Sequence, residues 1–220
     1  MRRWLQYGGF AAGVVLIAFG AVAIAMGAGG RSTVNDNLKQ EQIVGSADMT
    51  PAAIKTEAKA AGLPASVTLP TVDVSNQAIN TGARARAFAS YMRIHTLEAT
   101  GNLTYSQMGR YTAKPGANAK LTDGHGGTND PTAALLDPKT QQPVDNGGRN
   151  LWITETALTT ALNTSFMAEQ LSLFGIVVGI ALLLAGIGFG ILAVGPLRDP
   201  ERALQFSKTK KTKVEPVPTV

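Results

Sequence analysis

The two histidines have the clearest potential for chemistry in this chain of 220 residues. His95 and Glu98 are three residues apart, so a helix would present both on one face. His125 lies in a glycine-rich stretch between Gly124 and Gly126. Two histidines and one carboxylate are the ligand set of mononuclear non-haem iron sites. His95, Glu98 and His125 therefore define one functional hypothesis, an iron-dependent oxygenase. The alternative is that both histidines are solvated or hydrogen-bonded side chains.

Other catalytic signatures are missing from the sequence. The chain has no cysteine, which excludes thiolate catalysis, cysteine-based zinc sites and iron–sulfur clusters. It contains neither the serine elbow of α/β-hydrolases nor a phosphate-binding glycine loop. Asp123, Asp130 and Asp137 lack the spacing of a calcium-binding EF-hand. We therefore assign no catalytic, cofactor-binding or metal-binding residue from the sequence and expect no cofactor.

Two stretches without Asp, Glu, Lys or Arg determine the predicted architecture. They run from Trp4 to Gly30 and from Gln170 to Leu197. At about 1.5 Å of rise per residue, each would form a helix longer than the roughly 30 Å hydrocarbon core of a bilayer. Because neither stretch contains an ionisable residue, an ion pathway or a proton relay through the membrane is disfavoured.

The charge distribution predicts the orientation. The net charge of +5 resides at the two ends, which carry eight basic residues and three acidic ones, while the residues between Arg31 and Glu169 carry twelve of each. Basic flanks stay on the cytoplasmic side. We expect a multi-pass protein of the plasma membrane with membrane lipids, not nucleic acid, as partners. The predicted divisions are a cytoplasmic N-terminus (1–6), a first transmembrane helix (7–29), an extracytoplasmic domain (30–169), a second transmembrane helix (170–195) and a basic cytoplasmic tail (196–220).

The first apolar stretch has an alternative interpretation, a cleaved signal peptide. Its length favours an uncleaved anchor, since the apolar part of a signal peptide has only about 7–15 residues.

The predicted fold class is mostly α, with two transmembrane helices flanking a small, mainly helical domain that contains a long loop. Thr50 and Pro51 are a typical N-cap and first helical residue. A second helix is expected over 82–100, and a short strand or extended segment over 67–74. Residues 113–148 are dense in Gly, Pro, Asn and Asp, which predicts a long loop.

The region after the loop predicts one uninterrupted helix over residues 151–195, since no proline or glycine precedes Gly175. Leu158, Leu162 and Phe166 are expected to pack on helix 82–100, and Trp152 to be a core aromatic residue.

Glycines recur in both apolar stretches and predict close helix packing. Gly13, Gly20 and Gly27 follow one another at seven-residue intervals. The second stretch contains Gly175 and Gly179, then Gly186, Gly188 and Gly190. Small residues on one face let helix backbones approach closely in a membrane. We expect a tight helix pair, formed within the chain or with a partner.

Three segments carry a family resemblance: Met1–Gly9, Asp48–Pro51 and Leu151–Asn163. On these segments the chain resembles a family of uncharacterised two-span membrane proteins from high-GC Gram-positive bacteria. Members of that family are sometimes labelled aromatic ring-opening dioxygenase. The sequence favours a non-enzymatic accessory or interaction subunit of the cell envelope, with another membrane or envelope protein as its partner. The alternatives are the iron-dependent ring-opening oxygenase and an extracytoplasmic domain that senses a small molecule or lipid.

Overall fold

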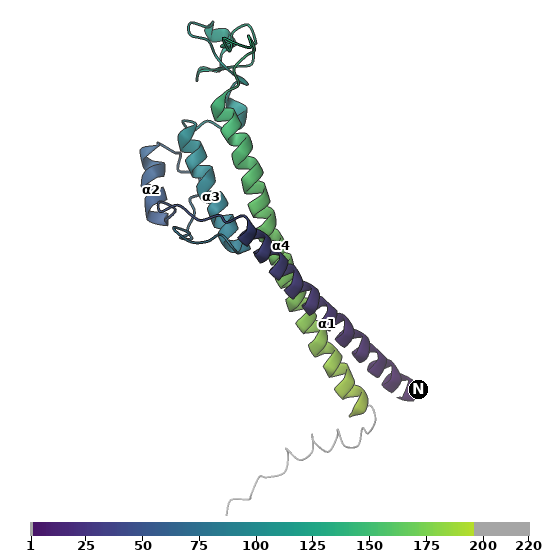
Figure 1. Cartoon of the computed structure of the whole chain (residues 1–220). Coiled ribbons are helices and arrows are strands. Elements are labelled where there is room, and N and C mark those ends of the chain that lie inside the picture. Colours follow the sequence, from purple (N-terminus) through teal and green to yellow (C-terminus); the bar gives the residue numbers. More distant parts are fainter. Residues whose placement is uncertain (1, 196–220) are drawn as a thin grey trace, which may run out of the picture. The chain divides into compact units, whose positions relative to one another are not determined.

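The computed structural model describes residues 2–195 and is mostly helical (Figure 1). The predicted basic tail, 196–220, lies outside the described residues. The chain forms two compact units, which are described separately below. One, the apolar unit, comprises the residues up to Arg31 and those from Leu171 onward; the other, the central unit, is Ser32–Gln170. The elements in chain order are α1 (Arg2–Gln40), α2 (Pro51–Ala60), α3 (Gly82–Ala99), the 3-10 turn η1 (Tyr105–Gln107), β1 (Tyr111–Thr112), the 3-10 turn η2 (Ala119–Leu121), β2 (Gly127–Thr128) and α4 (Gly147–Val194).

Helices α1 and α4 are long and apolar enough to cross a membrane. Their most apolar windows have mean hydropathies of 2.4 and 2.7. This confirms the predicted class, mostly helical with two long apolar helices. Helix α4 has 48 residues and is uninterrupted, as predicted for residues 151–195. It begins at Gly147, four residues before the predicted start.

Glycines bring the two helices of the apolar unit into backbone contact. A Cβ atom on Gly20 would lie 2.7 Å from the Gly179 carbonyl oxygen, and one on Gly13 would lie 2.9 Å from the Gly186 carbonyl oxygen. Neither position therefore has room for a larger side chain. The predicted tight helix pair is formed within the chain. By contrast, a Cβ atom on Gly188 would meet nothing within 4 Å.

The helices of the central unit begin at side-chain caps. The Thr50 hydroxyl accepts a hydrogen bond from the Ala53 amide at 3.1 Å, and Pro51 is the first residue of α2. The Thr81 hydroxyl caps α3 in the same way, at 3.3 Å from the Arg84 amide. These caps satisfy backbone donors that a helix leaves free at its first turn. They confirm the predicted start of α2 and place α3 within the predicted range.

The core of the central unit lies between α2, α3 and the first half of α4 (Figure 1). Buried Ile54 of α2, Tyr91 of α3 and Leu162 of α4 belong to one apolar cluster, and Leu158 packs against it. The Arg86 guanidinium carbon lies 4.7 Å from the centre of the Phe166 ring. The predicted packing of Leu158, Leu162 and Phe166 against α3 is therefore confirmed.

Trp152 is a core residue, as predicted. Its side chain is 3% exposed and belongs to a second apolar cluster with Leu97 and Met108. The indole Nε1 donates a hydrogen bond to the Leu103 carbonyl at 2.8 Å. Burial of a tryptophan is favourable only when this donor finds a partner. Trp152 thus joins the start of α4 to the end of α3.

Side-chain hydrogen bonds position the segment between α3 and α4, residues 101–146, which contains η1, β1, η2 and β2. Its only paired strands among the described residues are β1 and β2, two residues each and antiparallel. Asp123 accepts hydrogen bonds from the amides of Gly109, His125 and Gly127, at 2.6, 2.8 and 2.8 Å. Burial alone would raise the pKa of Asp123, but these three backbone donors lower it overall.

Of the two alternatives for residues 67–74, the structure has no strand but an irregular segment, in keeping with Pro70, which has no amide hydrogen for a ladder. Helix α1 ends at Gln40. Gln42 adopts a φ of 53°, in the left-handed region that terminates a helix.

Candidate functional site

Asp48, Glu57 and His95 converge at one point of the central unit. The His95 Nε2 atom lies 3.6 Å from Asp48 Oδ2 and 3.5 Å from Glu57 Oε1. One ligand-type atom from each of the three residues lies within 4.8 Å of the other two. Within residues 2–195 this is the only such group of three His, Cys, Asp or Glu side chains. We refer to these three residues as the carboxylate–histidine cluster.

Each member of the cluster is positioned by a different segment. Asp48 precedes α2 in a turn closed by a hydrogen bond from the Met49 amide to the Ser46 carbonyl at 3.1 Å. The Ser46 hydroxyl donates to Asp48 Oδ1, so that Oδ2 is the oxygen facing His95. Glu57 lies on α2 and His95 on α3. These two helices pack against each other in the core, so the cluster is a direct product of the tertiary fold.

The electrostatics of the cluster centre on Glu57. Burial, a hydrogen bond with Glu98 and the negative charges of Glu98 and Asp48 raise the pKa of Glu57 to about 7. The pKa of Asp48 is lowered, principally by the hydrogen bond from Ser46. The pKa values of the neighbouring Asp48 and Glu57 carboxyl groups are thus shifted in opposite directions. Glu57 exchanges a proton close to neutral pH.

Two atoms of the cluster are buried without a hydrogen-bond partner. Glu57 Oε1 and His95 Nε2 each have less than 1 Å² of exposed surface, and neither makes a hydrogen bond. Buried polar atoms are nearly always satisfied, because an unsatisfied one loses its hydration without replacement. The two atoms face each other at 3.5 Å, longer than the 2.7–2.9 Å usual for a charge-assisted hydrogen bond. The cluster therefore has room and unused bonding capacity for a proton or a cation.

The iron ligand set considered from the sequence is not assembled. His95 contributes to the cluster, and Glu98 lies beside Glu57, but His125 belongs to the loop held by Asp123. His125, Glu98 and His95 do not bring ligand atoms together as a group of three in the described part of the chain. These residues do not fit a facial iron site.

Asp48 and Glu57 were not predicted as site residues from the sequence. Only Glu57 has a feature in the sequence that could have identified it. Glu57 lies on the face of α2 that also carries Ile54 and Ala58, both buried. A carboxylate on the apolar stripe of an amphipathic helix is a recognisable anomaly, since charged residues are rarely buried without a partner. Asp48 carries no comparable signal, because an acidic residue just before a helix is ordinary.

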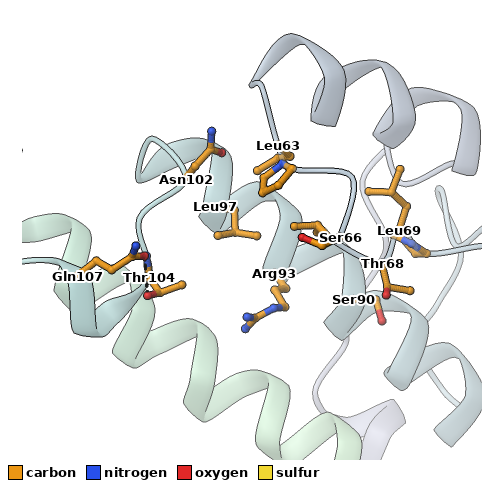
Figure 2. Close-up of a pocket in the computed structure, with 13 residues that line it drawn as sticks. Leu63, Ser66, Thr68, Leu69, Ser90, Arg93, Leu97, Asn102, Thr104 and Gln107 are labelled. Carbon is orange, nitrogen blue, oxygen red and sulfur yellow. Dashed lines mark hydrogen bonds between the residues drawn. The ribbon is translucent and has the colours of Figure 1, made fainter.

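A cavity of about 590 Å³ opens elsewhere on the central unit (Figure 2). Leu63, Val67 and Leu97 supply apolar wall, and Arg93 is the only ionisable residue among its lining residues. The Arg93 guanidinium carbon lies 5.2 Å from the centre of the Trp152 ring. Asn102 also lines the cavity, and its Oδ1 atom is buried without a hydrogen-bond partner. The cavity thus combines a cation, several hydroxyl and amide side chains and an apolar wall, as small-molecule sites do.

Comparisons of the chain with protein-family models, with curated proteins and with solved structures find no match.

Proposed function

We propose that the chain is an integral protein of the plasma membrane in the cell envelope, with both termini cytoplasmic and the central unit outside. In this proposal the central unit is a non-enzymatic accessory or interaction domain. Its partner is another membrane or envelope protein, and the apolar unit contacts membrane lipids. The resemblance to two-span membrane proteins of high-GC Gram-positive bacteria agrees with this proposal and remains a prediction.

One observation carries the membrane assignment: the apolar helices leave their side chains uncovered. Only 11% and 17% of the residues in their most apolar windows are buried. Phe19 is 66% exposed and Leu184 is 64% exposed. The core helix of a water-soluble protein buries such residues, whereas contiguous exposed apolar surface marks contact with lipid or another protein. The basic residues at the chain ends support the cytoplasmic orientation.

Single cysteines test the orientation, because the natural chain has none. His125→Cys places a thiol on an exposed residue of the central unit, and Lys210→Cys places one in the basic tail. A membrane-impermeant maleimide added to intact cells should label position 125, and should label position 210 only after lysis. Equal labelling of both positions from outside, or labelling of 210 alone, would contradict the proposed topology.

Purification of the full chain from its own host in mild detergent, after crosslinking, tests the accessory role. The expected result is one envelope protein recovered in constant ratio to this chain. Recovery of the chain alone would contradict an accessory role while leaving the membrane assignment intact.

The cavity beside Arg93 favours a second candidate function, a sensor domain for a small amphipathic anion. A carboxylate would pair with the Arg93 guanidinium while its alkyl chain contacts the leucine-lined wall. Trp152 reports on this site, because Arg93 stacks on its ring.

Titration of the full chain with hexanoate tests the sensor function. Trp4→Phe leaves Trp152 as the only tryptophan. Hexanoate should then change its fluorescence saturably, uncharged 1-hexanol should not, and Arg93→Gln should abolish the response. Arg86→Gln on the same helix is the matched control and should preserve it. An identical response to both compounds would contradict recognition of an anion.

A further inference from the structure

The carboxylate–histidine cluster has no role in the function proposed above. It is built from three segments, namely the turn before α2, α2 itself and α3, and it lies wholly within the central unit. The side chains of Glu57 and His95 are only 18% and 25% exposed. Burying a carboxylate beside an imidazole, with the exposed Asp48 carboxylate at their edge, is unfavourable unless something compensates the charges and unused lone pairs.

The spacing of the cluster matches a metal coordination shell. At bond lengths of about 2.0–2.1 Å, two ligand atoms of a tetrahedral metal site lie roughly 3.3 Å apart. His95 Nε2 lies 3.5 Å from one carboxylate oxygen and 3.6 Å from the other. These two contacts would close around an ion with shifts of a few tenths of an ångström, and one ligand atom from each of the three residues lies within 4.8 Å of the other two.

The unpartnered atoms argue for an ion over a simple ion pair. If His95 and Glu57 served only to neutralise each other, the contact should close to a charge-assisted hydrogen bond. Instead Nε2 and Oε1 are both buried and both lack a hydrogen bond. Asp48 Oδ2 faces the same histidine nitrogen, while Oδ1 is occupied by the Ser46 hydroxyl. A single cation would satisfy all three facing atoms at once.

We propose that Asp48, Glu57 and His95 bind one divalent transition-metal ion, for which Zn²⁺ is the probe. An imidazole ligand selects zinc and its neighbours over magnesium and calcium, which prefer oxygen ligands alone. Three protein ligands leave a fourth position open for water or an external donor. The ion would link the turn before α2 to both helices and thereby stabilise the central unit.

Calorimetric titration of the full chain in detergent micelles tests the proposal. The protein carries a purification tag without histidine and is first freed of metal with EDTA. The expected result is one Zn²⁺ bound per chain at pH 7.5. The variants Glu57→Gln and Asp48→Asn should bind Zn²⁺ at least about tenfold more weakly. Asp48 is exposed, so its substitution leaves the core intact and separates loss of binding from loss of folding.

The second histidine provides the matched control. His95→Ala should abolish stoichiometric binding, whereas His125→Ala removes an exposed imidazole of the loop and should change nothing. Mg²⁺ and Ca²⁺ titrations should show no binding at concentrations that saturate Zn²⁺. Three results would each overturn the proposal: no saturable Zn²⁺ binding to folded protein, equal loss in His95→Ala and His125→Ala, or binding of Ca²⁺ as tight as that of Zn²⁺. None of them affects the membrane topology, so this inference and the proposed function fail independently.

Discussion

Glu57 should make the metal-free central unit less stable as the pH rises. Its pKa is about 7 in the folded chain against an ordinary value of 4.5. Between these two values the folded chain retains a proton that the unfolded chain has released. The contribution of Glu57 to the free energy of unfolding is therefore highest below pH 4.5, falls as the pH rises toward 7, and becomes level above it.

The size of this effect follows from the pKa difference. The pKa rises from 4.5 to about 7, and at about 1.4 kcal/mol per pKa unit this sets an upper value of about 3 kcal/mol. Because the Glu57 side chain retains 18% of its exposure, water screens part of the interaction. Between pH 5 and pH 8 only part of this difference is lost, and after screening we expect a loss of about 1–2 kcal/mol. For a unit of this size, that change lowers Tm by roughly 5 °C.

Glu57→Gln isolates the contribution of this carboxyl group, because glutamine resembles the protonated form and cannot ionise. With EDTA present, the variant should lose most of the pH dependence and exceed the natural chain in stability at pH 8. Thermal unfolding is followed by Trp152 fluorescence in the Trp4→Phe background, since Trp152 is 3% exposed when folded. Glu41→Gln, at an exposed position of the same unit, is the matched control and should retain the natural profile. Identical profiles for the natural chain and Glu57→Gln would refute the reasoning, as would stability that rises from pH 5 to pH 7.

Three further substitutions test the packing. Leu162→Ala should destabilise the central unit by about 2–5 kcal/mol, because it leaves a cavity. Leu151→Ala, at a half-exposed position, should change the stability by less than about 0.5 kcal/mol. Limited proteolysis of membranes containing the full chain measures the difference, and equal protease resistance of the two variants would contradict the packing of Leu162 in the core. Gly20→Val should separate the apolar helices. Gly8→Val should not, because a Cβ atom at Gly8 has open space. Disulfide crosslinking between cysteines introduced into the two helices reports their separation. Asp123→Ala removes an acceptor of three backbone amides and should destabilise the loop by about 1–3 kcal/mol, seen as faster hydrogen exchange there; unchanged exchange would show that other contacts hold it.

Local rules predicted the helices because their signals are local. The cap at Thr50 acts over three residues, and the apolar stretches are recognisable by the absence of charge alone. The packing of Leu162 on α3 was also predictable, since an amphipathic helix must bury its apolar face. Each of these features depends on a short window of sequence.

The carboxylate–histidine cluster depends on contacts that no short window contains. Asp48 and His95 meet only after α2 has packed against α3, so their proximity is a property of the tertiary structure. The path of the chain through the loop could not be predicted from the sequence either. Single side chains such as Asp123 determine its path through bonds to distant amides, and sequence patterns carry no periodic signal for such bonds.

The contact between Gly20 and Gly179 has a consequence for the timing of biosynthesis. The two glycines are 179 − 20 = 159 residues apart, which a ribosome at about 5–20 residues per second covers in roughly 8–32 s. During that interval the first apolar helix has been made and its partner has not. If the helices lie in a membrane as proposed, lipid or another helix covers this glycine face during that interval, and α4 has to displace that neighbour. Under the proposed function, the pairing of the two helices is thus a late step in the maturation of this protein.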